Sequence, residues 1–157
     1  VLLSRCAEFH RIAAILHRYT NKPIGIILSI GLLNELFKPK WSENLAGGLL
    51  ESFGRLFKEG VTLHVFPWKN RRNGELVTAE TFHAPDDSVH LYRHFLANGR
   101  ILAIPCEDDF VLSYTGRDVC RMISAKDERW RQLVPEEAWT MAERHVRLDA
   151  PDQPEHS

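Results

Sequence analysis

The side chains best suited to chemistry lie in two short segments. The first, Trp68-Lys69-Asn70-Arg71-Arg72, places an indole beside three cations. An indole can stack on a nucleobase, and ammonium and guanidinium groups bind phosphate. The second, Ser113-Tyr114-Thr115-Gly116-Arg117, precedes an expected helix, whose positive end and free N–H groups can bind an anion. The candidate nucleotide- and phosphate-binding residues are Trp68, Arg71, Arg72, Ser113, Thr115 and Arg117.

Each segment also has a structural interpretation. Trp68 can cover the core while Arg71 and Arg72 form a solvated basic turn. Thr115 can simply cap its helix, a role that is far commoner than phosphate binding. The residue types alone leave both interpretations open for both segments.

The histidines raise the question of a metal. His90 and His94 lie four positions apart on one expected helix, with His83 nearby. A catalytic zinc site needs three protein ligands, and Leu91 stands where the His-Glu-x-x-His pattern has its Glu. We therefore assign no metal site, and a metal-dependent hydrolase that uses these histidines is a third hypothesis. Cys106 is interpreted as a structural thiol, and no catalytic residue is assigned.

The apolar pattern predicts the elements that hold these segments. Short apolar runs at 24–30, 61–66 and 101–104 are typical of strands buried on both faces of a parallel sheet. Three- and four-residue periodicity and capping residues predict helices at 2–18, 32–37, 42–58, 86–97, 116–124 and 135–148. Asn73-Gly74 indicates a turn, either in a small hairpin or in a surface loop.

Strands that alternate with helices form parallel sheets through right-handed crossovers. The predicted fold class is therefore α/β, a Rossmann-like three-layer sandwich with a mostly parallel sheet of about 3–5 strands. Ligands of such sheets bind beyond the carboxyl ends of the strands. This rule selects Gly31 and the segments 67–72, 105–109 and 113–118.

Composition limits the class of protein. A chain of 157 residues with 44% hydrophobic residues is long enough for one core, so we expect a single α/β domain over 1–148 and a disordered Pro-rich tail over 149–157. With 20 Lys and Arg against 21 Asp and Glu, no strong field attracts nucleic acid or anionic lipid. We therefore expect no nucleic-acid partner and no membrane partner.

Two further expectations concern the setting of the chain. The odd set of Cys6, Cys106 and Cys120 fits free thiols in a reducing compartment, which predicts a cytoplasmic protein. The apolar helical pattern already begins at Val1. This start predicts the later part of a longer protein, with a further N-terminal domain or a second copy of the chain as partner.

One stretch carries a family resemblance. Its motif residues are Leu112, Ser113, Thr115, Arg117, Val119, Ile123, Asp127, Trp130 and Leu133-Val134-Pro135. Residues 101–135 thereby resemble the C-terminal end of the nicotinate and nicotinamide mononucleotide adenylyltransferases. In that family an Ile-Ser-x-Thr-x-x-Arg motif opens a helix, and an Ile, an acidic turn, a Trp and a Leu-Val-Pro follow it.

The sequence departs from the family in its phosphate-binding residues. Alignment through Val119 and Trp130 places the family's phosphate-binding Arg on Cys120. A register that keeps Ser113 and Thr115 places Asp118 there instead. The family's His-x-Gly-His or Thr-x-Gly-His signature, which binds the triphosphate, is absent from the sequence.

The resemblance implies a nucleotide-binding domain whose partner is a small-molecule nucleotide. If active, it would transfer an adenylyl group from ATP, with Mg²⁺, to a mononucleotide such as NMN or NaMN by positioning phosphates and stabilising charge. The missing signature residues favour the alternative of a non-catalytic regulatory or protein-interaction domain on the same scaffold.

Overall fold

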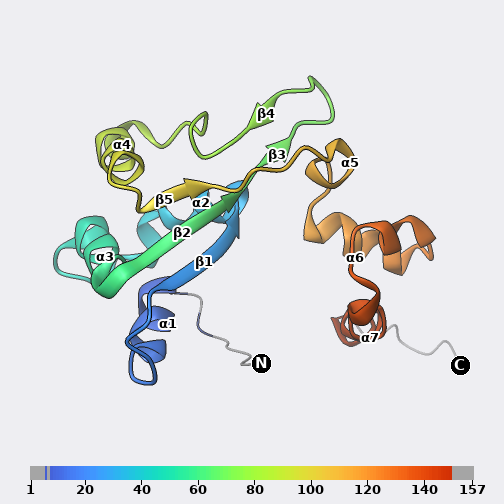
Figure 1. Cartoon of the computed structure of the whole chain (residues 1–157), viewed down its shortest axis with the longest axis horizontal. Coiled ribbons are helices and arrows are strands. Elements are labelled where there is room, and N and C mark those ends of the chain that lie inside the picture. Colours follow the sequence, from blue (N-terminus) through green and yellow to red (C-terminus); the bar gives the residue numbers. More distant parts are fainter. Residues whose placement is uncertain (1–5, 7, 150–157) are drawn as a thin grey trace, which may run out of the picture. The chain divides into compact units, whose positions relative to one another are not determined.

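Three parallel strands form the sheet, in the order β1-β2-β5 (Figure 1). The structure, a computed structural model, describes residue 6 and residues 8–149. The strands are β1 (Ile24–Ser29), β2 (Val61–Phe66) and β5 (Ile101–Ala103). The parallel register runs from Ile24 opposite Val61 to Ser29 opposite Phe66, and β5 pairs with the other edge of β2. The predicted Rossmann-like α/β fold with a mostly parallel sheet is confirmed.

The chain forms two compact units, Val1–Cys106 and Glu107–Ser157. The first unit contains the sheet and the second is helical. The single domain expected over 1–148 stays a prediction. Residues 150–157 of the predicted tail, and residues 1–5 where the apolar pattern begins, lie outside the described part of the chain.

Helices precede and connect the strands of the first unit. They are α1 (Phe9–Leu16), α2 (Ile30–Leu36), α3 (Gly48–Leu56) and α4 (Val89–Ala97). α2 and α3 lie between β1 and β2 in the chain, and α4 lies between β2 and β5. The central strand turns Val61, Leu63 and Val65 into the core, where each is fully buried. Aromatic rings from the helices pack in the same core, with centroids 5.0 Å apart for Phe37 and Phe53.

The opposite face of the sheet is open within this unit. Successive side chains of a strand point to opposite faces, so Ile27 and Leu102 point away from the core residues. Ile27 is 73% exposed and Leu102 is 40% exposed. The prediction that β1 and β5 are buried on both faces is therefore wrong. Their β-branched and apolar side chains favour a strand, but that preference does not require that both faces be covered.

Several predicted helix boundaries are also wrong. Within the described residues, the helix expected over 2–18 spans Phe9–Leu16, and the α-helix expected from residue 135 begins at Trp139. The helix expected from Ser42 begins at Gly48, because the Ser42 hydroxyl instead donates to the Pro39 carbonyl at 3.2 Å within the 3₁₀ turn η1 (Pro39–Trp41). Ile30, assigned to the first strand, is the first residue of α2. The last turn of the helix α3 leads to Gly60, which has the positive φ of 80° expected there.

The second unit contains α5 (Asp109–Leu112), α6 (Gly116–Ser124) and α7 (Trp139–Asp149), with 3₁₀ turns η4 (Glu128–Gln132) and η5 (Glu136–Ala138) between α6 and α7. Trp130 is 2% exposed, and its ring meets Trp139 edge-on at 6.1 Å. The Trp139 indole N–H donates to the Val134 carbonyl at 2.8 Å. Trp130 and Val134, two of the residues that carry the resemblance, thus hold Trp139 in place in this unit.

None of the helices in the described part of the chain combines the length and the apolar character needed to cross a membrane.

The two faces of the sheet should respond differently to the same substitution. Leu63→Ala should lower the free energy of unfolding by about 2–5 kcal/mol, because it leaves a cavity in the core. Leu102→Ala, on the open face, should lower it by about 1 kcal/mol or less. Urea denaturation followed by circular dichroism measures both losses. Equal losses would show that the face around Leu102 is covered in solution.

Candidate functional site

The carboxyl ends of the three strands form one row. The register places Ser29 beside Phe66, and the N–H of Ile104 donates to the Val65 carbonyl at 2.9 Å. β1 runs directly into α2, the hairpin that contains Trp68 follows β2, and the segment 104–106 follows β5. This is the edge at which open parallel α/β sheets bind ligands.

The junction of β1 and α2 has no Gly-rich loop, since the helix begins at the residue after the strand. The Ser29 hydroxyl accepts a hydrogen bond from the Leu32 N–H at 3.4 Å and so caps α2. Gly31 is exposed in the first turn of α2. The first N–H groups of a helix have no intrahelical acceptor, so this junction presents the positive end of α2 at the carboxyl edge.

A hairpin carries the basic segment. β3 (Trp68–Lys69) pairs antiparallel with β4 (Leu76–Val77), which decides between the two predicted alternatives in favour of the hairpin. The Asn70 N–H donates to the Glu75 carbonyl at 2.8 Å and the Gly74 N–H donates to the Asn70 carbonyl at 2.8 Å. Gly74 has a φ of 72°, which a side chain would strain. These bonds fix the loop that contains the two arginines.

Trp68, Arg71 and Arg72 all belong to this hairpin. Trp68 is half-buried and follows the buried Pro67, whereas Arg71 and Arg72 are exposed in the loop. The Arg72 N–H donates to the Asn70 side-chain oxygen at 2.9 Å, which holds the backbone of the loop in place. One hairpin therefore carries an aromatic side chain on β3 and two guanidinium groups in the loop that follows it.

The chain that returns from the hairpin is anchored in the core. Ala79 is fully buried, and the Tyr92 hydroxyl donates to its carbonyl at 2.5 Å. Burial raises the pKa of Tyr92, so its hydroxyl stays protonated and remains a donor. The Phe82 ring meets Tyr92 edge-on at 5.3 Å. Sequence reasoning missed this anchor, because a Tyr on an amphipathic helix gives no sign of the carbonyl that it will bind.

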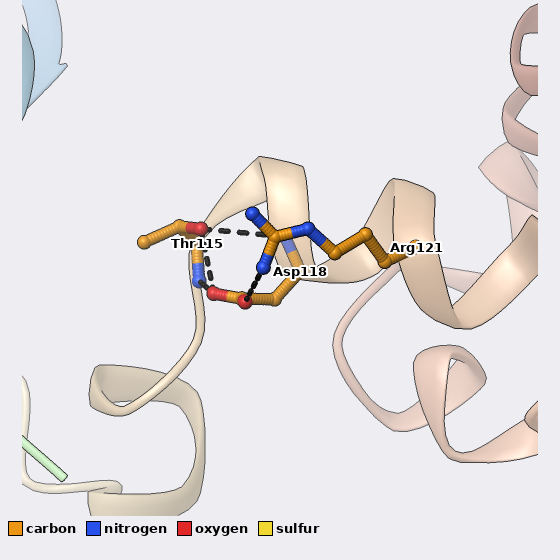
Figure 2. Close-up of polar contacts among 3 residues, drawn as sticks. All are labelled: Thr115, Asp118 and Arg121. Carbon is orange, nitrogen blue, oxygen red and sulfur yellow. Dashed lines mark hydrogen bonds and ion pairs between the residues drawn. The ribbon is translucent and has the colours of Figure 1, made fainter.

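The second predicted segment surrounds the start of α6 in the second unit (Figure 2). The Thr115 hydroxyl accepts from the Asp118 N–H at 3.3 Å, and the Asp118 carboxylate accepts from the Thr115 N–H at 2.9 Å. Arg121 approaches the same carboxylate at 3.3 Å. Asp118 thus already places a negative charge at the positive end of α6.

Ser113 and Arg117, the other two predicted binding residues of this segment, lie before α6 and in its first turn. The Ser113 hydroxyl donates to the Asp109 carbonyl at 2.7 Å. Arg117 is exposed in the first turn of α6. The six predicted binding residues therefore belong to two units, with Trp68, Arg71 and Arg72 in the first and Ser113, Thr115 and Arg117 in the second.

The predicted histidines have ordinary surroundings. His90 and His94 lie on α4, and the His94 ring is 3.3 Å from the Asn98 side-chain nitrogen. Among the residues that the structure describes, no three His, Cys, Asp or Glu side chains are grouped so that they could hold a metal ion. His83 is among the residues searched. The hypothesis of a metal-dependent hydrolase therefore has no set of metal ligands in the described residues.

Comparisons with protein-family models, with curated proteins and with solved structures found no match to this chain. The likeness to the mononucleotide adenylyltransferases stays an expectation from the motif residues. The candidate site is therefore interpreted from its own geometry and charges.

The cap of α6 can be tested directly. Thr115→Ala should lower the free energy of unfolding by about 1 kcal/mol, because it removes the acceptor of the Asp118 N–H. Thr115→Ser keeps that acceptor and should cost only a few tenths of this amount. Thermal unfolding followed by near-ultraviolet circular dichroism, which reports on Trp130 and Trp139 packing, measures both. A neutral Thr115→Ala variant would refute the structural role of the cap.

Proposed function

We propose that this chain is a nucleotide-binding domain that binds its ligand at the carboxyl edge of the parallel sheet. The observation that carries the proposal is the position of the Trp68 hairpin, which leaves the sheet directly at the end of β2, the central strand. An indole, an ammonium and two guanidinium groups thereby stand at the edge where such sheets bind ligands.

The chemistry of this edge suits a base joined to phosphates. The base stacks on Trp68, and Arg71 and Arg72 bind phosphate oxygens by charge-assisted hydrogen bonds. The register that places Ser29 beside Phe66 brings the positive end of α2 to the same edge. Because the chain as a whole has a net charge of −1, the attraction of a phosphate is local to this edge.

Adenylyl transfer from ATP, with Mg²⁺, to NMN or NaMN is the activity that the family resemblance implies. The transfer needs groups that position the phosphates and neutralise the developing charge. At the start of α6 the Asp118 carboxylate takes up the Thr115 N–H that such a site would use. Nucleotide binding without turnover is therefore the function that these residues support best.

A second candidate is a non-catalytic protein-interaction domain, and the open sheet face favours it. Ile27 is 73% exposed there, and Leu102 also faces solvent. Exposed apolar surface of this kind is common at protein interfaces. Cys6, Cys106 and Cys120 form no disulfide among the described residues, and reduced cysteines support the proposed cytoplasmic location for either candidate.

Titration calorimetry with ATP, NMN and NAD tests the nucleotide proposal. Trp68→Ala should weaken binding at least about 5-fold, because stacking contributes about 1–3 kcal/mol per base. Trp68→Phe should retain most of the affinity. Arg72→Ala should weaken the binding of ATP more than that of NMN, since ATP carries more phosphate charge.

Arg129→Ala is the matched control, because Arg129 is an exposed arginine of the second unit whose guanidinium is paired with Asp127 at 2.6 Å. It should leave nucleotide affinity unchanged. The proposal fails if none of the three nucleotides binds at millimolar concentration, or if Arg72→Ala and Arg129→Ala behave alike. Self-association that Ile27→Asp abolishes, together with no nucleotide binding, would instead select the interaction domain.

A further inference from the structure

A cavity of about 320 Å³ lies among the helices of the first unit. Its walls come from the chain before α1, from α1, α2 and α3, and from the turn η1. Most of the lining is apolar and includes Phe9, Ile12, Leu36, Trp41, Phe53 and Leu56. Small-molecule sites commonly have volumes of about 300–1,000 Å³ and walls that are mostly apolar. Both the size and the lining of this cavity match that class.

His10 is a largely buried polar side chain in the cavity wall. It is only 8% exposed, and within the described part of the chain no hydrogen bond joins its ring to another group. Burial lowers the pKa of His10, so the ring is neutral near pH 7 and offers one donor and one acceptor. The ring nitrogens of His10 are not among the fully enclosed unpaired polar atoms of the described residues, so a ligand in the cavity can hydrogen-bond to this ring in place of water.

The carboxylates that line the cavity are already neutralised. Glu8 pairs with Arg11 at 2.8 Å. Glu35 pairs with Lys38 and with Lys40, and their hydrogen bonds lower the pKa of Glu35 to about 2. Among the described residues of its lining, the cavity therefore presents neither an unpaired acid to attract a cation nor an unpaired base to attract an anion. An uncharged ligand suits such a wall because it loses little solvation on entry.

We propose that this cavity binds an uncharged small molecule with an aromatic or aliphatic body and a single hydroxyl group that hydrogen-bonds to His10. The body packs between Trp41 and Phe53, and Ser52 supplies a second polar group in the lining. None of the residues that line the cavity belongs to the Trp68 hairpin. The inference therefore does not rest on nucleotide binding at the sheet edge.

Three related probes separate the parts of this proposal. 2-Naphthol has the body and the hydroxyl, naphthalene lacks the hydroxyl, and 2-naphthoate carries a negative charge. Binding to the full chain is measured at pH 7.5 by fluorescence titration, with the His10 ring protons followed by NMR. 2-Naphthol should bind at one site at least about 10-fold more tightly than 2-naphthoate and should shift the His10 signals.

Variants of the cavity assign the site. His10→Phe keeps the volume of the wall and removes the hydrogen bond, so it should weaken 2-naphthol about 10-fold and leave naphthalene nearly unchanged. His90→Phe is the matched control on an exposed helix position and should change neither affinity. Ser52→Leu fills the cavity from α3 and should reduce the binding of both probes, and it keeps the test decisive if His10→Phe does not fold.

Three results would overturn the proposal. They are no saturable binding of 2-naphthol up to millimolar concentration, equal affinities for 2-naphthol and 2-naphthoate, and unchanged 2-naphthol affinity in Ser52→Leu. ATP titrations on the same folded variants report on the sheet edge separately. Failure at the cavity is therefore distinguishable from failure of nucleotide binding.

Discussion

The parallel pairing of β2 with strands on both sides is the constraint on which the first unit depends. Val61, Leu63 and Val65 are fully buried because helices cover that face of the central strand. The same pairing fixes the row of strand ends from which α2 and the Trp68 hairpin start. A shift of register by one residue would turn the buried side chains to the open face. The register therefore determines both the packing of the core and which residues lie at the carboxyl ends of the strands.

Much of this arrangement could be predicted from local patterns. The strand predicted over 61–66 has the same first and last residues as β2. Thr115 caps the start of α6, as the capping pattern predicts. Asn73-Gly74 marks the hairpin correctly. In each case the determining physics lies within a few residues: β-branched side chains, a hydroxyl acceptor for a helix N–H, and a glycine with positive φ.

Features that depend on distant residues could not be predicted in this way. Ile27 has the same residue type as Ile26, which packs against the core, and only the absence of packing on its own side in the first unit makes Ile27 exposed. The bond from Tyr92 to Ala79 joins residues 13 positions apart, and no spacing rule predicts it. The place of His10 in the cavity wall depends on how α1 packs with α2 and α3, which the local sequence around His10 does not indicate.

Because β1 leads into α2 without a loop, one short helix borders both the carboxyl edge of the sheet and the cavity. The first turn of α2 stands at the carboxyl edge of the sheet, and Leu32, Glu35 and Leu36 of the same short helix form part of the cavity wall. No loop separates Ser29 from Ile30, so α2 begins directly at the end of the strand. The carboxyl edge and the cavity therefore share one seven-residue helix, whose start lies at the edge and whose side chains form part of the cavity wall.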